Sequence, residues 1–261
     1  MSDPQTEQDH DAKEAPLVSH LIELRDRILR SVAVILVVFV LLVNWSNEIY
    51  IFVVQPLLDA LPEGVSMIGV NPLDAFFAPF KLTFMVAFCI SIPFVLHQAW
   101  AFISPGLYRN EIRVTFPILV SSVILFYVGL AFCYYVVLGF LFKFFIDSAP
   151  VIVVMMPDIK TTLDLSLKFF FAFGLIFEIP VATTLLVMSG VTTPKDLAIK
   201  RPYVVIGCFV VGMFLTPPDP FSQSMLAIPM WMLFEIGILS SKIFYKEDEA
   251  DREAEADQEA S

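Results

Sequence analysis

Glu178 is the residue whose type and setting point most directly to chemistry. It lies within residues 169–180, where most of its neighbours are phenylalanine, leucine and isoleucine. A charged carboxylate at the centre of a membrane costs about 2.5–3.5 kcal/mol on insertion scales. We therefore expect Glu178 to be protonated at pH 7. It would serve as a proton site or as a polar anchor for another helix; the alternative is a structural carboxyl that binds a freed backbone carbonyl.

Pro180 follows Glu178 after one residue and predicts a break in the helix at this point. Proline has no N–H to donate, and its ring crowds the carbonyl four residues earlier, that of Ile176. Glu235 lies in a second apolar segment, nearer to its end, and the sequence leaves open whether it is functional or structural.

Glu23 and Glu111 are two carboxylates in segments that flank the apolar runs. Arginine binds carboxylates through two parallel hydrogen bonds, so a pair of glutamates at one surface suits a pair of incoming guanidinium groups. The alternative is that each glutamate pairs locally, with Arg27, Arg109 or Arg113. Spacing alone does not decide between these two interpretations.

The usual signatures of enzymes and metalloproteins are absent from the sequence. The patterns GxSxG, HExxH and Walker A do not occur, and the three histidines are too scattered to form a cluster. Each of the three cysteines lies inside an apolar segment, without CxxC spacing. We therefore expect no catalytic residue, no cofactor and no metal site, and the absence of a basic patch argues against nucleic-acid binding.

The composition is that of a membrane protein. Mean hydropathy is +0.77, 57% of the residues are hydrophobic and 16% are charged, against roughly 25% charged residues in soluble domains. Six apolar segments predict an all-α membrane protein with six transmembrane helices. These segments cover residues 28–45, 80–103, 114–142, 165–189, 203–216 and 224–241.

The fifth and sixth segments are predicted to be short. The fifth covers only about 21 Å of a hydrocarbon layer that is about 30 Å thick. Because a turn rich in proline joins the two, we expect them to form a short hairpin, with Thr216 and Gln223 flanking its turn. Local thinning of the bilayer would accommodate such a hairpin.

Lysine and arginine predict the orientation. Twelve of them lie in the two tails and in the loops near residues 104–113 and 190–202, and four lie on the opposite side. The positive-inside rule then places both termini in the cytoplasm of a bacterium, with the chain in its inner membrane.

The ends of the chain differ from its body. Leu17, Leu21, Leu24 and Ile28 recur at helical spacing and predict an amphipathic helix at the cytoplasmic interface, before the first span. Residues 1–15 and 246–261 are acidic and are predicted to be disordered, leaving residues 16–245 as the membrane domain.

Several long motifs resemble the TatC family, the multispanning core subunit of the twin-arginine protein translocase. The similarity runs from about residue 16 to residue 245 and leaves out both acidic tails. The motifs are SHLIELRDR at 19–27, QAWAFISPGLYRNE at 98–111, FGLIFEIP at 173–180, KRPY at 200–203 and LTPPDPFSQ at 215–223.

The resemblance implies a receptor for signal peptides that carry two consecutive arginines, on proteins that cross the membrane already folded. It assigns arginine binding to Glu23 and Glu111, with Phe102 beside them, and the same motifs contain Arg25 and Tyr108. Transport would be driven by the proton motive force, together with the single-span subunits TatA and TatB and further copies of the chain.

The resemblance also gives meaning to the intramembrane polar residues. Glu178, beside Pro180, corresponds to a polar site for partner helices, and Thr216 and Gln223 correspond to a second one. Asp219 lies in the external loop motif. The rival hypothesis is a proton-coupled secondary transporter of a small solute, which would depend on Glu178 beside a broken helix and not on Glu23 or Glu111.

Overall fold

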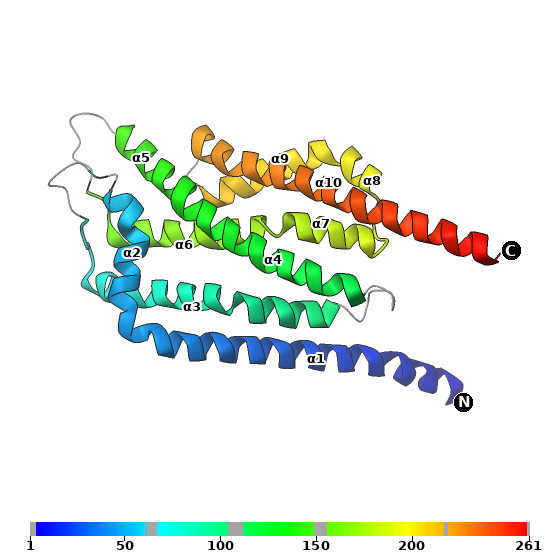
Figure 1. Ribbon diagram of the computed structural model, residues 1–261. Coiled ribbons are helices and arrows are strands. Elements are labelled where there is room, and N and C mark those ends of the chain that lie inside the picture. The colour runs from blue at the N-terminus through cyan, green and yellow to red at the C-terminus, as the bar shows by residue number, and fades with distance from the viewer. Residues whose placement is uncertain are drawn as a thin grey trace.

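The protein is a bundle of long helices, described here from a computed structural model (Figure 1). The structure describes the backbone of residues 4–59, 61, 67–103, 112–148, 156–216 and 219–259, and side chains within 20–243 of these except 103 and 112–115. The described elements are α1 (Pro4–Leu42), a 3-10 turn (Val43–Trp45), α2 (Ser46–Leu58), α3 (Pro72–Ile103), α4 (Ile112–Phe132), a π-helical stretch (Cys133–Leu138), α5 (Gly139–Asp147), α6 (Ile159–Ile176), α7 (Ile179–Met188), α8 (Pro194–Ile199), α9 (Arg201–Leu215) and α10 (Pro220–Glu259).

The predicted fold class, all-α with six apolar helical segments, is confirmed. Five helical stretches are long and apolar enough to cross a membrane, and Arg201–Leu215 is a shorter apolar helix. The five are His20–Leu58, Pro72–Phe102, Phe116–Asp147, Ile159–Met188 and Pro220–Ile243. The prediction that the sixth segment is short was wrong, because the helix begins at Pro220 and its apolar part continues to Ile243. Of the two segments in the hairpin, only α9 is short.

Both chain ends lie on the same side of the bundle, as an even number of crossings requires (Figure 1). The end of the molecule opposite the termini is covered by α2, which runs across the other helices rather than along them. The sequence analysis did not predict α2, because Ser46–Leu58 is a continuation of the first apolar stretch after a short turn.

The amphipathic segment before the first span is part of α1 and not a separate interfacial helix. No glycine or proline occurs between Leu17 and Leu42 that could end the helix. The backbone of residues 4–15 and 246–259 is also helical, whereas their acidic composition predicted disorder. Both tails are rich in alanine, glutamate and glutamine, which favour helix when an ordered helix continues into them.

The fourth apolar segment is broken at the place that Pro180 predicted. Helix α6 ends at Ile176, and α7 begins at Ile179 with proline in its first turn. Proline is well accepted in a first turn because its missing N–H would have no intrahelical partner there. The third segment is interrupted as well, since the π-helical stretch separates α4 from α5.

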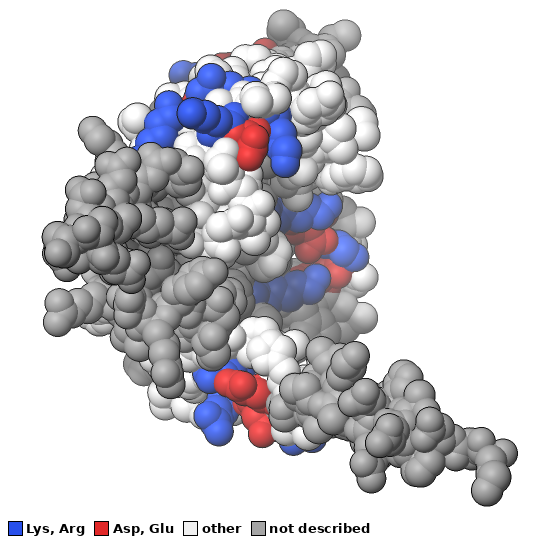
Figure 2. Space-filling model, turned by 90° about the vertical axis from the view of Figure 1, so that its right-hand side faces the viewer, with Lys and Arg blue, Asp and Glu red and all other residues white. Residues whose placement is uncertain are grey.

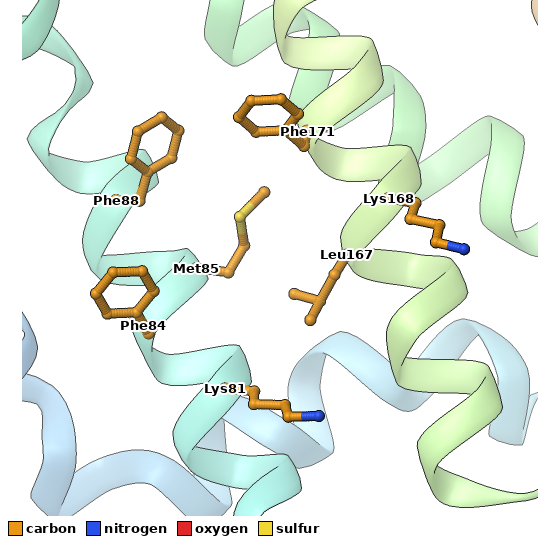
Figure 3. A pocket seen from close by; sticks show the side chains of 7 residues that line it. All are labelled: Lys81, Phe84, Met85, Phe88, Leu167, Lys168 and Phe171. Atoms are coloured by element: carbon orange, nitrogen blue, oxygen red, sulfur yellow. The ribbon is translucent and has the colours of Figure 1, made fainter. Parts of the chain in front are cut away.

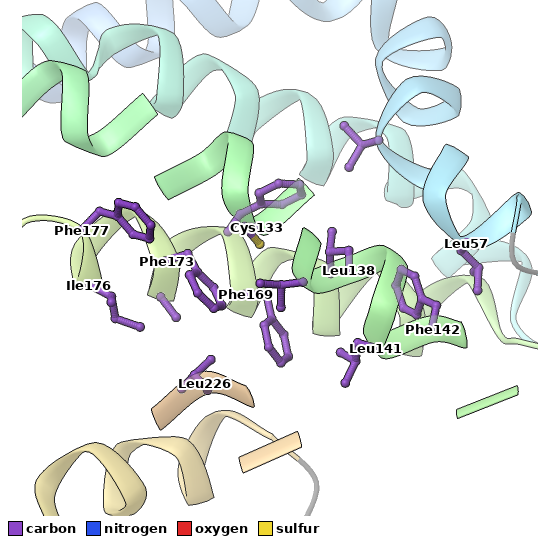
Figure 4. Close-up of a cluster of buried hydrophobic side chains, with 14 of the residues drawn as sticks. Leu57, Cys133, Leu138, Leu141, Phe142, Phe169, Phe173, Ile176, Phe177 and Leu226 are labelled. Carbon is purple, nitrogen blue, oxygen red and sulfur yellow. The ribbon is translucent and has the colours of Figure 1, made fainter. Parts of the chain in front are cut away.

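The core lies where α6 meets the π-helical stretch and the first turns of α10 (Figure 4). Phe169, Phe173, Leu138 and Leu226 are almost completely buried there. At Gly129, an added Cβ atom would lie 2.7 Å from the carbonyl oxygen of Phe173, so only glycine lets α4 approach α6 this closely. In a bilayer such close van der Waals contact stabilises helix association, because lipid tails are as apolar as the side chains.

Polar contacts hold α3 to α6 at the end that carries α2. Lys81 lies 3.8 Å from Asp164, and Lys160 lies 3.3 Å from Asp74. Asp158 caps α6 by accepting a hydrogen bond from the Thr161 backbone N–H at 3.0 Å. Hydrogen bonds from Thr161 lower the pKa of Asp158, which keeps this cap ionised.

Candidate functional site

The first candidate site joins α1 to α3 at the end of the bundle where the termini lie. Glu23 Oε1 accepts two hydrogen bonds from Arg27, from Nε at 2.9 Å and from Nη2 at 2.6 Å. Arg27 Nη1 also donates to Gln98 Oε1 on α3, at 3.3 Å. Glu23 Oε2 makes no hydrogen bond to any residue within the described ranges. The glutamate is therefore paired and oriented, while one of its oxygens can still accept a donor.

Phe102 closes this site from α3. Its ring stacks on the imidazole of His20, with centroids 4.1 Å apart and an interplanar angle of 16°. The contact brings the last turn of α3 against the helix that carries Glu23. We define Glu23, Arg27, Gln98, His20 and Phe102 as the α1–α3 cluster.

The remaining residues predicted for this site are placed differently. Arg25 pairs with its neighbour Asp26 at 2.7 Å, and its side chain is 67% exposed, so it does not join the α1–α3 cluster. Tyr108 and Glu111 lie outside the described residues. The local pairing of Glu23 with Arg27, which the sequence left open, is present.

Charged residues on this side of the molecule occur in groups of mixed sign. Figure 2, viewed from the side where the termini lie, shows lysine and arginine in separate groups, each with acidic side chains among them. One ion pair on this side links the start of α9 to α10, where Arg201 holds Glu235 through Nε and Nη2, both at 2.7 Å. Glu235 therefore has a partner of opposite charge on α9.

The second candidate site surrounds Glu178 at the break between α6 and α7. Ser122 of α4 donates a hydrogen bond from Oγ to Glu178 Oε2. The other carboxyl oxygen, Oε1, is buried and has no partner among the described residues. The carboxyl thus binds a neighbouring helix rather than a freed backbone carbonyl, and it retains one unused hydrogen-bonding atom.

The turn after Glu178 packs closely on α10. Pro180 is buried, and its carbonyl accepts hydrogen bonds from Thr183 Oγ1 at 3.0 Å and Thr184 Oγ1 at 2.8 Å. Thr184 Oγ1 also lies 2.9 Å from Ser240 Oγ on α10. A Cβ atom at Gly237 would lie 3.0 Å from the Cα atom of Pro180 and would overlap Thr183. Pro180 therefore breaks the helix and also lies in a helix–helix contact.

Thr216 and Gln223 meet at the turn between α9 and α10. Thr216 is buried and donates from Oγ1 to the Gly212 carbonyl at 2.9 Å. The Gln223 side chain packs against the same glycine, and its Nε2 atom donates to the Phe209 carbonyl at 2.7 Å. Both side chains bind the backbone of α9, while Glu178 binds α4, so their contacts do not join them to Glu178 in one polar site.

Asp219 is the N-cap of α10. Its Oδ1 atom accepts a hydrogen bond from the Ser222 backbone N–H at 2.7 Å, which satisfies one of the free donors of the first turn. Its Oδ2 atom is buried without a partner among the described residues. The sequence analysis placed Asp219 in a loop motif without this role.

An apolar groove of about 690 Å³ lies between α3 and α6. Figure 3 shows Phe84, Met85, Phe88 and Phe171 around the gap and Lys81 at one end, whereas Lys168 points away from it. Apart from the two lysines, its lining is apolar. Among the side chains that the structure describes, no group of three histidine, cysteine, aspartate or glutamate residues could hold a metal ion.

Comparison with known proteins assigns the fold. The family model of Sec-independent protein translocase protein (TatC) matches residues 19–229. The chain belongs to the TatC family. It is 51% identical to the TatC protein of Azotobacter chroococcum over 91% of this chain and 94% of that one. It is 50% identical to the Escherichia coli K12 protein, over 88% and 89%.

A solved structure agrees with this assignment. A crystal structure of the twin arginine translocase receptor TatC is 33% identical to this chain, covers 86% of it and 98% of its own length, and superposes with a TM-score of 0.77. The chain is thus a multi-pass membrane protein of a bacterial protein translocase, and this family is not one of catalytic enzymes.

The sequence analysis missed two residues that complete the candidate sites. Ser122 holds Glu178, and the signal for it was the serine pair in an otherwise apolar run over residues 114–142. Gln98 binds Arg27 and was visible only as a polar residue near the end of the second span. In both cases the partner lies on another helix, which no spacing along the sequence reveals.

Proposed function

We propose that this TatC protein is the receptor subunit for twin-arginine signal peptides and binds them on the face that carries the α1–α3 cluster. A related solved structure is that of the twin arginine translocase receptor TatC, which supports the assignment. The cargo would be folded proteins, moved across the membrane together with TatA and TatB under the proton motive force.

One observation carries this proposal, namely how Glu23 is paired and how far it is exposed. Its Oε1 atom is bound by an arginine of the protein itself, and its side chain is 41% exposed. Nε and Nη2 of Arg27 both donate to this one oxygen, so a guanidinium group already fits beside the carboxylate. The second oxygen, or exchange with Arg27, would then accept an arginine of the signal peptide.

The other residues at this site would add affinity. Phe102, stacked on His20, offers an apolar surface beside the carboxylate for the residues that follow the arginines. We propose that Glu111 supplies the second carboxylate, and that Arg25 and Tyr108 complete the surface of the site.

The proposed orientation places both termini in the cytoplasm. Twelve lysine and arginine residues lie in the tails and in the loops of that side, against four on the other. Signal peptides emerge in the cytoplasm, so a receptor face on this side is where the peptide arrives. We take residues 16–245 as the membrane domain, with the acidic tails outside it.

We propose two contact sites for partner helices in the membrane. Glu178, beside Pro180, has a free buried oxygen that a polar residue of TatA or TatB could bind. Thr216 and Gln223, with Asp219 capping α10, form the second site at the short α9 hairpin. Further copies of the chain, and membrane lipid, would complete the assembly.

The test is photo-cross-linking of a signal peptide to the full chain in membranes. A peptide with two arginines should cross-link to the wild-type protein, whereas the same peptide with two lysines should not. The double variant Glu23→Gln with Glu111→Gln should lose most of the signal. Asp26→Asn is the matched control, because Asp26 lies on the same helix and is also paired with an arginine.

Two results would contradict the proposal. One is equal cross-linking of the arginine and lysine peptides. The other is unchanged cross-linking to the double variant, with the variant present in membranes in wild-type amount.

A further inference from the structure

A further site, so far without an assigned role, lies at the end of the bundle away from the termini. There a hollow of about 410 Å³ opens between α2 and the chain that runs from the π-helical stretch into α5. Asp59 and Gln55 line it from one side, and Tyr134, Tyr135 and Lys143 line it from the other. At Gly139, which also lines the hollow, an added Cβ atom would meet nothing within 4 Å, so the wall is open there.

The charges in this hollow are complementary but separate. Asp59 and Lys143 line the same space, yet they form no ion pair with each other, and neither has one with another residue in the described part of the chain. Gln55 Nε2 donates to Asp59 Oδ1 at 2.7 Å, which fixes the carboxylate and leaves its second oxygen available. An acid and a base held apart in this way suit a ligand that carries both signs of charge.

Two tyrosines line the hollow on the side that carries Lys143. Tyr134 and Tyr135 meet edge to face with centroids 4.9 Å apart, and Tyr134 donates to the Phe52 carbonyl at 2.7 Å. The Tyr135 side chain is 75% exposed. Tyrosine is enriched where a protein crosses the membrane interface, and its ring face attracts ammonium groups. Such a tyrosine-rich lining is typical of a site at the depth of lipid head groups.

An apolar cavity adjoins the hollow. The same two tyrosines line a space of about 240 Å³ whose other walls include Leu82, Met85 and Val86 of α3. A polar hollow that shares two residues with an apolar cavity fits an amphiphilic molecule, with its head in the first and a hydrocarbon chain entering the second.

We propose that this hollow binds a phospholipid with a zwitterionic aminoethyl head group, as in phosphatidylethanolamine. Lys143 binds the phosphate, Asp59 accepts hydrogen bonds from the ammonium group, and an acyl chain enters the apolar cavity beside Tyr134. A phospholipid without the amine would leave Asp59 facing a phosphate, which disfavours anionic lipids here. This site is independent of the proposed signal-peptide site, because it lies at the opposite end of the bundle.

The test is native mass spectrometry of the full chain with three lipids that share the same acyl chains: phosphatidylethanolamine, phosphatidylcholine and phosphatidylglycerol. The wild-type protein should retain one phosphatidylethanolamine about tenfold more tightly than either of the others, because only its ammonium donates N–H bonds to a carboxylate. Asp59→Asn should remove this preference, whereas Lys143→Gln should weaken the binding of all three lipids.

Controls separate this effect from general lipid binding. Lys81→Gln and Asp147→Asn alter exposed charges of the same kinds that do not line the hollow, and they should keep the wild-type preference. Each variant is checked for a wild-type unfolding temperature, which we expect because Asp59 and Lys143 are exposed. Equal retention of the three lipids by the wild-type protein would overturn the proposal. So would a phosphatidylethanolamine preference that survives Asp59→Asn.

Discussion

Glu23 and Glu178 are the same residue type in two opposite settings. Glu23 is partly exposed in the middle of α1, and an arginine of the next helical turn pairs with it. Glu178 lies among apolar side chains at a helix break, and its partner is the neutral hydroxyl of Ser122. Burial without a cation disfavours the charged form, whereas pairing with arginine favours it.

The comparison contrasts a carboxylate that is paired with a cation and one that is held only by a neutral donor. At the α1–α3 cluster, the internal Arg27 can give way to another guanidinium because water reaches the pair. At Glu178, the carboxyl group can gain a hydrogen bond through its free Oε1 only if a partner brings a polar group into the membrane. With the proposed orientation, the first site would receive a peptide from the cytoplasm, and the second would receive a partner helix in the bilayer.

The largest effect is expected from a change in the buried contact between α7 and α10. Gly237→Ala should lower the free energy of unfolding by about 3 kcal/mol, because the new methyl group overlaps Thr183 and forces α10 away from α7. Thermal and denaturant unfolding in detergent would measure it. Gly207→Ala is the matched control, since an added Cβ there meets nothing within 4 Å; an equal loss in both variants would contradict this account of α7–α10 packing.

Removing the partner of Glu178 should have the next largest effect. Ser122→Ala leaves a second carboxyl oxygen without a donor and should cost about 1–3 kcal/mol. Infrared spectroscopy should also show a shifted Glu178 carbonyl band, and Ser122→Thr should restore it in part. Ser121→Ala is the control, because Ser121 forms no hydrogen bond to Glu178; an unshifted band in Ser122→Ala would show that the contact is not formed.

Asp219, the N-cap of α10, stabilises the start of this helix in the α9–α10 hairpin. Asp219→Ala should destabilise the start of α10 by about 1 kcal/mol, because the Ser222 N–H loses its acceptor. Asp219→Asn keeps an acceptor oxygen and should retain most of the stability. Amide hydrogen exchange over residues 220–224 would report the change; equal exchange in the alanine variant and the wild-type protein would rule out the capping role.

The smallest effect is expected at Phe102 in the α1–α3 cluster. Phe102→Ala should weaken twin-arginine peptide binding by roughly threefold, because one aromatic contact contributes about 0.5–1.5 kcal/mol beyond its buried area. Phe102→Tyr should restore the affinity, since the ring remains. Affinity measured by peptide fluorescence would decide, and a loss that Phe102→Tyr does not restore would argue against a stacking role.

Apolar runs were sufficient to predict that the chain has six apolar helical segments. The break at Pro180 followed from the chemistry of proline, which acts locally. The sixth span was predicted to be too short, because the proline and serine residues around residue 220 interrupt the hydrophobic pattern while still fitting the first turn of a helix. The course of α2 across the bundle depends on packing against other helices, which local sequence does not encode.

The candidate sites were predictable only in part, for a similar reason. Glu178 stands out as an acid in an apolar run, and Glu23 was singled out by the resemblance to the TatC family. Their partners on other helices, Gln98 and Ser122, are ordinary polar residues until the fold brings them within hydrogen-bonding distance. Arg25 was predicted as part of the signal-peptide site, but it pairs with Asp26, whereas Arg27 reaches Gln98 on α3.

The most direct test compares the two glutamates in one binding measurement. The affinities of matched twin-arginine and twin-lysine signal peptides would be determined for the wild-type protein, Glu23→Gln and Glu178→Gln, all purified as the full chain. We predict that Glu23→Gln loses the preference for arginine, while Glu178→Gln keeps it at the wild-type level. The account would be contradicted if Glu178→Gln abolished the preference and Glu23→Gln left it intact.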